Sequence, residues 1–126
     1  MYDVLLPKNA VQIVRGTSKT LQLAVTDPQS KPVNLTGATI IMTVKNRVED
    51  QKNIFQKTTA DPTQVKITDS FGGIAQIFIQ PTDTQFRDVK EYVFDVWVIL
   101  PSGARYDVIP PTVFELTASV TSWPLT

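Results

Sequence analysis

The carboxylates that could carry out acid–base chemistry or bind a metal in this chain are mostly aspartates. Histidine and cysteine are absent, which excludes thiolate chemistry, thiolate metal sites and imidazole general bases. The aspartates stand at Asp3, Asp27, Asp50, Asp61, Asp69, Asp83, Asp88, Asp95 and Asp107. Several of them adjoin Pro, Ser or Thr, where turn geometry explains their presence.

A calcium site is the chemistry that such carboxylates would most readily support. Asp61, Asp69 and Asp83 fall in predicted loops, but their spacing resembles no known calcium-binding loop. The glycines are scattered and form no phosphate-binding pattern. We therefore expect no catalytic residue, no metal and no cofactor, and an enzyme is the least favoured class of function.

The composition bounds the class of protein. A chain of 126 residues favours one domain. Its 12 basic and 12 acidic residues give a formal charge of zero, which offers no electrostatic basis for binding nucleic acid or an anionic membrane. No apolar run approaches the ~20 residues of a membrane helix. The N-terminal residues lack the pattern of a signal peptide. We expect neither nucleic acid nor a membrane as a partner.

The segments that would position these side chains have the pattern of short β-strands. Residues 21–26 and 39–45 alternate between two faces with a period of two. Residues 91–100 are the most apolar run, and their β-branched and aromatic residues favour a central strand. Turn signals separate these segments at roughly regular intervals. The pattern predicts an all-β chain, an immunoglobulin-like antiparallel β-sandwich of about seven to nine strands.

Three shorter segments are predicted with less regular structure. Residues 46–53 are expected to form a solvated loop. Residues 81–86 are expected to form one helical turn that Thr82 could cap. The pair Pro110-Pro111 is expected to break the sheet, because prolines are tolerated only at a sheet edge. The predicted organisation is an N-terminal arm over 1–9, the sandwich over 10–120 and a C-terminal arm over 121–126.

A tyrosine supports the immunoglobulin-like prediction. Tyr92 follows a short turn and precedes the inward residue Phe94 by two positions, as the corner tyrosine of immunoglobulin-type domains does on the penultimate strand. Phe94 would stand where antibody domains place a cysteine, with Leu23 as its partner on an early strand. The predicted core comprises Leu21, Leu23, Val25, Ile40, Met42, Val44, Ile77, Tyr92, Phe94 and Val96.

The opposite face of the same strands predicts a docking surface. If Tyr92 and Phe94 point inward, Trp97 points outward in an apolar stripe, which is a candidate interface. The alternatives are the opposite register, or a loop or arm that covers the stripe. Large apolar residues in both arms also suggest capture by the same domain or by a neighbouring subunit. The candidate interface residues are Tyr2, Leu5, Leu6, Ile41, Val93, Trp97, Ile99, Trp123 and Leu125.

The order of several short segments resembles a known family. The segments are PVNLTGATI at 32–40, FQKT at 55–58, a Gly73 hairpin, a Pro81-Thr82-Asp83-Thr84 turn and YVFDV at 92–96. In this order they resemble the N-terminal domain of the phage baseplate upper protein family and related immunoglobulin-like phage structural modules. The resemblance extends from about Val11 to Val120.

The resemblance implies a non-enzymatic structural protein of a tailed bacteriophage virion, made in the host bacterial cytoplasm. Its partners would be other phage structural proteins of the tail, baseplate or capsid, with self-association in a symmetric ring. Because the 126 residues include no fibre-like extension, we expect an assembly or adaptor module of the tail or baseplate rather than a receptor-binding protein. The alternatives are a capsid decoration protein and a carbohydrate-binding module that uses Trp97 or Trp123.

Overall fold

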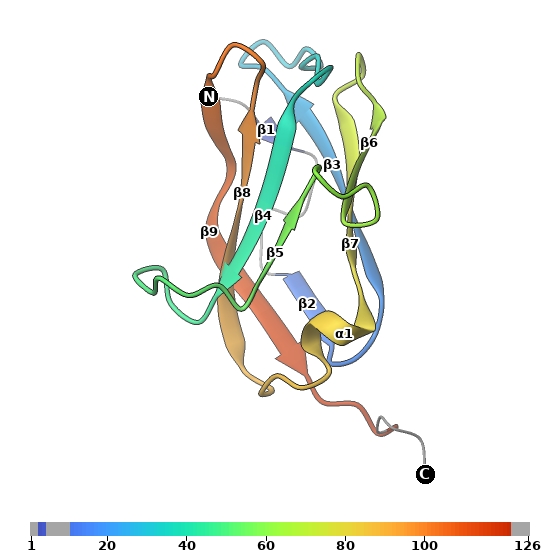
Figure 1. The fold of residues 1–126 in the computed structure, drawn as a ribbon, viewed down its shortest axis with the longest axis vertical. Helices are drawn as coiled ribbons and strands as arrows, with labels where there is room; N and C mark the ends of the chain where they lie inside the picture. Colours follow the sequence, from blue (N-terminus) through green and yellow to red (C-terminus); the bar gives the residue numbers. More distant parts are fainter. Residues whose placement is uncertain (1–2, 5–10, 122–126) are drawn as a thin grey trace.

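The computed structural model describes residues 3–4 and 11–121 as two β-sheets packed face to face (Figure 1). One sheet has the strand order β1-β3-β7-β6, formed by Asp3–Val4, Lys19–Thr26, Ile74–Ile79 and Val65–Asp69. The other has the order β2-β9-β8-β4-β5, formed by Val11–Val14, Arg105–Thr117, Glu91–Ile99, Thr39–Lys45 and Phe55–Thr58. The short helix α1, Pro81–Thr84, follows β7. The all-β, immunoglobulin-like sandwich predicted from the sequence is confirmed.

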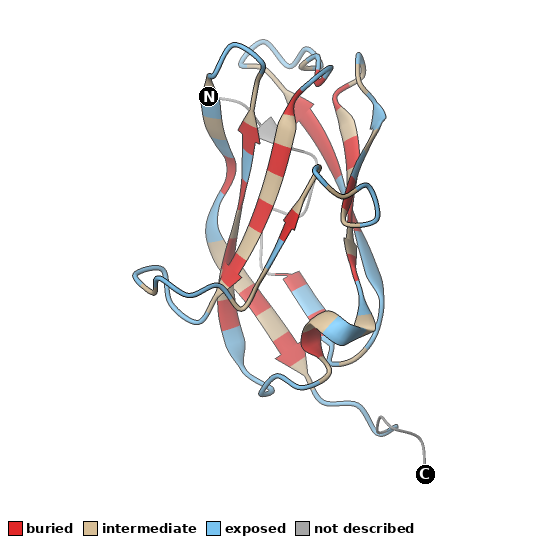
Figure 2. Ribbon diagram, in the orientation of Figure 1, coloured by how far each residue is buried: buried red, intermediate tan, exposed pale blue. Residues whose placement is uncertain are grey.

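Alternating burial explains why these segments form strands. Successive residues of β4 are half-buried and buried in strict alternation, and β8 shows a similar pattern. Figure 2 shows this alternation along β4 as bands of two colours. Because side chains alternate between the faces of a strand, one face of each strand lies in the core and the other faces outward.

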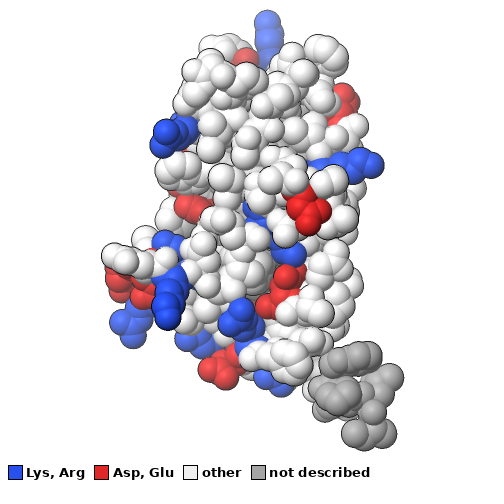
Figure 3. All heavy atoms as spheres, in the orientation of Figure 1, with Lys and Arg blue, Asp and Glu red and all other residues white. Residues whose placement is uncertain are grey.

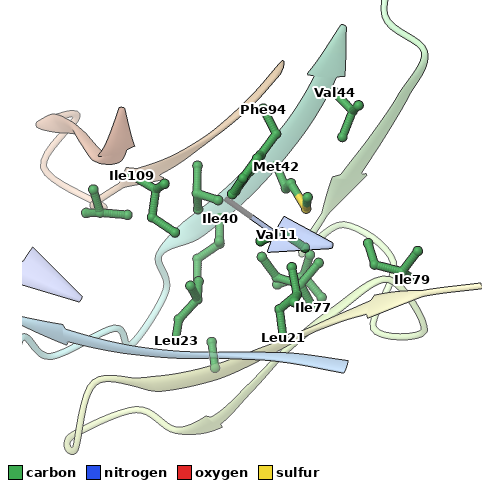
Figure 4. Close-up of a cluster of buried hydrophobic side chains, with 14 of the residues drawn as sticks. Val11, Leu21, Leu23, Ile40, Met42, Val44, Ile77, Ile79, Phe94 and Ile109 are labelled. Atoms are coloured by element: carbon green, nitrogen blue, oxygen red, sulfur yellow. The ribbon is translucent and has the colours of Figure 1, made fainter. Parts of the chain in front are cut away.

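The core lies between the two sheets. Figure 4 shows Leu21, Leu23 and Ile77 from one sheet pointing toward Ile40, Met42 and Phe94 from the other. All ten residues that the sequence places in the core are buried: Leu21, Leu23, Val25, Ile40, Met42, Val44, Ile77, Tyr92, Phe94 and Val96. The rings of Phe94 and Phe55 both pack edge to face on the buried ring of Phe114, with centroid separations of 6.1 and 5.8 Å. Such aromatic contacts add to the stabilisation from buried area.

The corner tyrosine has the geometry that the sequence suggests. The Tyr92 hydroxyl donates a hydrogen bond of 2.7 Å to the carbonyl oxygen of Asp88, four residues upstream. The side chain of Tyr92 is buried at the start of β8. This contact fixes the turn that enters β8 and matches the tyrosine corner of immunoglobulin-type domains.

Three features of the sheets differ from the predictions. Pro110-Pro111 does not end a strand, because β9 continues through both prolines beside irregularities in its pairing with β8. These irregularities allow the consecutive residues Val108 and Ile109 both to be buried. The pairing of β2 with β9 is parallel, so the sandwich is not wholly antiparallel. Asp3–Val4, in the predicted N-terminal arm, pair with β3.

A buried ion pair joins the edge strand β5 to helix α1. The ammonium of Lys57 lies 2.6 Å from the carboxylate of Asp83, and the two side chains are only 5% and 16% exposed. Asp83 also accepts a hydrogen bond of 2.7 Å from the backbone N–H of Gln80. Gln80 is therefore the N-cap residue of α1, in a capping box with Asp83, and the prediction that Thr82 caps this turn is wrong.

The turn between β6 and β7 packs against the chain that leaves β3. Gly73 has a φ of +71°, as the predicted glycine turn requires. Its carbonyl accepts a hydrogen bond of 2.8 Å from the N–H of Val25, and the carbonyl of Val25 accepts one of 3.0 Å from Val33. Backbone atoms thus surround Gly73 closely.

No helix among the described residues is long and apolar enough to cross a membrane.

Candidate functional site

A groove lies on the outward face of the five-stranded sheet, over β4 and β8. Its volume is about 310 Å³, at the lower end of the ~300–1,000 Å³ typical of ligand pockets. Val48 and Asn53, from the loop between β4 and β5, line one side of the groove, and Pro111 of β9 also lines it. The predicted outward stripe is therefore hollowed, and the loop borders it rather than covering it.

Trp97 lies on β8, the middle strand of this sheet. Its side chain is 40% exposed. The strand register places it opposite Ile41 of β4 on one side and opposite Asp107 of β9 on the other. Directly paired residues share one face of a sheet, so all three side chains point outward. Val93 precedes Trp97 by four residues in β8, so it lies on the same face and extends the apolar lining.

Polar side chains border the apolar lining. The amide of Gln56 on β5 donates a hydrogen bond of 2.9 Å to the Thr43 hydroxyl. Thr43 pairs with Asp95 of β8, and Lys45 follows on the same face of β4. The groove therefore combines an aromatic ring and aliphatic side chains with a carboxylate, an amide and an ammonium group.

Two carboxylates on this face have raised pKa values. Desolvation raises the pKa of Asp95, although a hydrogen bond from the Trp97 side chain and the charge of Lys45 partly offset it. Desolvation, reinforced by the negative charge of Asp95, raises the pKa of Asp107 to about 6. Asp107 as a whole residue is exposed, so solvent screening keeps the energetic consequence small.

We expect Asp107→Asn to stabilise the fold near pH 7.5 by about 0.5–1 kcal/mol after solvent screening. The pKa of Asp107 is 3.8 ordinarily and about 6 in the fold. At a pH between these two values, the folded chain keeps a proton on Asp107 that the unfolded chain has lost. The wild type therefore loses stability as the pH rises through this window, and the asparagine variant does not. Urea unfolding at pH 7.5 and at pH 4 measures the difference, which should vanish at pH 4. Equal stability of the two proteins at pH 7.5 would contradict this expectation.

The structure brings three of the predicted interface residues together: Ile41, Val93 and Trp97 line the groove. Ile99 shares their face but pairs with Thr39 and Arg105 at the far end of β8, outside the groove. The other predicted interface residues lie outside the described part of the chain: Tyr2, Leu5, Leu6, Trp123 and Leu125.

The sequence reasoning missed the residues that other strands and the loop bring to this face. They are Val48, Asn53, Gln56, Asp107 and Pro111. The outward direction of Gln56 is indicated by its place between the inward residues Phe55 and Lys57 of the short segment FQKT. The pairing of Asp107 with Trp97 depends on the irregular register of β9, which no sequence pattern indicated.

Charge is distributed unevenly over the face of the molecule that Figure 3 shows. Figure 3 shows single basic and acidic side chains among large uncharged areas, with a denser mixed group on the side of the β4–β5 loop. That loop carries Arg47, Glu49, Asp50 and Lys52. The mixed signs give this face no large basic patch of the kind that nucleic acid requires.

Comparison with known proteins identifies the fold and no family. No protein-family model and no curated protein matches the chain. The crystal structure of CopC from Methylosinus trichosporium OB3b is similar, with a TM-score of 0.52 and 12% identity over 94% of this chain and 95% of that chain. The structure of murine CRIg is 18% identical over 94% of this chain and 98% of that chain, with a TM-score of 0.46. At 12% identity the similarity to CopC concerns the β-sandwich alone.

Proposed function

We propose that this chain is a non-enzymatic structural protein of a tailed bacteriophage virion, an assembly or adaptor module of the tail or baseplate. The phage assignment is supported by the short sequence segments between Val11 and Val120, which in their order along the chain resemble baseplate proteins. The observation that carries the docking role is the groove around Trp97, with its apolar lining and polar border. Burial of such a face against a partner stabilises an assembly without bond chemistry.

The proposed partners are other phage structural proteins, and the proposed location is the virion. Copies arranged in a symmetric ring would present the same groove at every subunit, because closed symmetry repeats one interface. Capsid decoration is the alternative within this class. Quantitative mass spectrometry of purified particles separates the two, since a tail adaptor has about six or twelve copies and a decoration protein on the order of hundreds.

We expect Trp97→Ala to lower the amount of this protein in phage particles at least tenfold. A buried tryptophan at the centre of an interface contributes about 2 kcal/mol or more to binding, and its loss weakens binding by roughly 30-fold. Mass spectrometry of particles assembled with each variant measures the loss. Phe86→Ala is the matched control, because Phe86 is an 82% exposed aromatic residue outside the groove.

Both variants should unfold cooperatively, because Trp97 and Phe86 are partly or largely exposed. Thermal unfolding followed by circular dichroism verifies this before particles are compared. Normal incorporation of a folded Trp97→Ala variant would refute docking through this groove.

A carbohydrate-binding module is the second candidate, and the structure provides an observation that favours it. Trp97 shares its groove with Asn53, Gln56 and Asp95, and saccharide sites group an aromatic ring with a few polar side chains. Binding of the wild type to a saccharide array, abolished by Trp97→Ala, would support this candidate.

A further inference from the structure

We propose that the groove receives a lysine or arginine side chain of a partner protein, with its cationic group between Asp95 and Asp107 and against the Trp97 indole. This inference rests on the proposed docking function and names the chemistry of the partner at that site. Four observations support it: the placement of the carboxylates around the ring, the uncompensated charge of Asp107, the apolar lining and the size of the groove.

The first observation is the placement of the two carboxylates around the indole. Asp95 precedes Trp97 by two residues in β8, so both side chains lie on the outward face. Asp107 is the direct partner of Trp97 in β9 and lies on the same face, next to the groove, whose lining includes Asp95 but not Asp107. A cation over the face of a tryptophan ring is attracted by the ring itself. At this position the two neighbouring carboxylates would attract the same cation.

The second observation is that the negative charge of Asp107 lacks a compensating partner among the described residues. The charge of Asp95 raises the pKa of Asp107, and no basic side chain lowers it. Lys45 on β4 acts on Asp95 instead. Arg105 precedes Asp107 by two residues on β9 and forms no ion pair with it. An arriving ammonium or guanidinium group would relieve the repulsion between the two carboxylates.

The third observation is the apolar lining beside this charge. Ile41 lies on the other side of Trp97, and Val93 and Pro111 also line the groove. Lysine and arginine have aliphatic stems that pack on apolar surface while the charged end reaches a polar group. The combination of an apolar wall and a carboxylate pair therefore suits a basic side chain better than a neutral apolar one.

The fourth observation concerns the size of the groove and the side chains that could hold a metal ion. A volume of about 310 Å³ suits one long side chain with parts of its neighbours. A metal ion fits less well, because the described residues contain no group of three or more acidic, histidine or cysteine side chains that could hold one. The cation is therefore expected to belong to a protein side chain.

The test uses the full chain and a synthetic random-peptide library as the probe. We expect the peptides selected by the immobilised wild type to be enriched in lysine or arginine at one position. Replacing that residue with the neutral citrulline or norleucine should weaken binding at least about tenfold, because it removes charge-assisted hydrogen bonds. Asp95→Asn and Asp107→Asn should each weaken binding of the basic peptide by a similar factor.

Glu91→Gln is the matched control, since Glu91 is an exposed acidic residue on the same face of β8 outside the groove. This variant should bind the basic peptide as the wild type does. Failure to select peptides, selection of peptides without a basic residue, or binding by both asparagine variants that is as tight as that of the wild type would overturn the proposal. Saccharide binding that Trp97→Ala abolishes would overturn it in favour of a glycan.

These failures are distinguishable from failure of the proposed function. If Trp97→Ala is excluded from particles but no basic peptide binds, docking stands and the basic partner is refuted. If Trp97→Ala enters particles normally, docking through the groove is refuted whatever the peptides show.

Discussion

Replacing Gly73 with alanine is expected to destabilise the fold by about 3–4 kcal/mol. A φ of +71° is costly for a residue with a Cβ atom, by roughly 1–2 kcal/mol. That Cβ atom would also lie 2.6 Å from the carbonyl oxygen of Val25 and 3.0 Å from that of Val33. The backbone must then move, which weakens the hydrogen bonds between Gly73, Val25 and Val33 at about 1 kcal/mol each.

Gly103→Ala provides the control for backbone strain alone. Gly103 has a φ of +90°, but a Cβ atom there would meet nothing within 4 Å. This variant should lose only about 1–2 kcal/mol. Urea unfolding of both variants measures the difference, which isolates the steric contribution at Gly73. Equal losses in the two variants would show that the close approach to Val25 does not matter.

Removing one partner of the buried ion pair is the second change with a large expected effect. Asp83→Asn leaves the Lys57 ammonium, 5% exposed, without its counter-charge, and such uncompensated burial costs about 3–5 kcal/mol. The asparagine can still accept the N–H of Gln80, so the loss reports mainly on the ion pair. Chemical denaturation at neutral pH measures it.

Lys57→Met should cost much less, about 1 kcal/mol, because it removes the buried charge and keeps an apolar stem of similar size. Asp83 is 16% exposed and keeps its hydrogen bond to Gln80. The double variant Lys57→Met, Asp83→Asn should therefore be more stable than Asp83→Asn alone. A double variant less stable than Asp83→Asn would mean that the two side chains stabilise the fold independently.

The sequence predicted the strands and their faces well, because burial follows the period of two. Tyr92, Phe94 and Val96 point inward as predicted, and Trp97 consequently faces outward. The tyrosine corner was also predictable, since it depends on a spacing of a few residues within one segment. These features are local, and local pattern is sufficient to specify them.

Features that depend on neighbouring strands could not be predicted in the same way. Asp107 meets Trp97 only because the irregular pairing of β9 shifts the register. The continuation of β9 through Pro110-Pro111 depends on the same irregularity. The burial of Lys57 could not be predicted, because the carboxylate that compensates its charge, Asp83, lies in a turn 26 positions further along the chain. Long-range pairing decides each of these cases.

The inward direction of Lys57 has a consequence for how copies of this protein can associate. β5 is the last strand of its sheet and is only four residues long. A slip of one residue would turn Lys57 into solvent and bury Gln56 in its place. An ammonium held beneath an edge strand also discourages another chain from adding to that edge. We therefore expect strand addition at the β5 edge to be disfavoured, which removes one route to fibre growth.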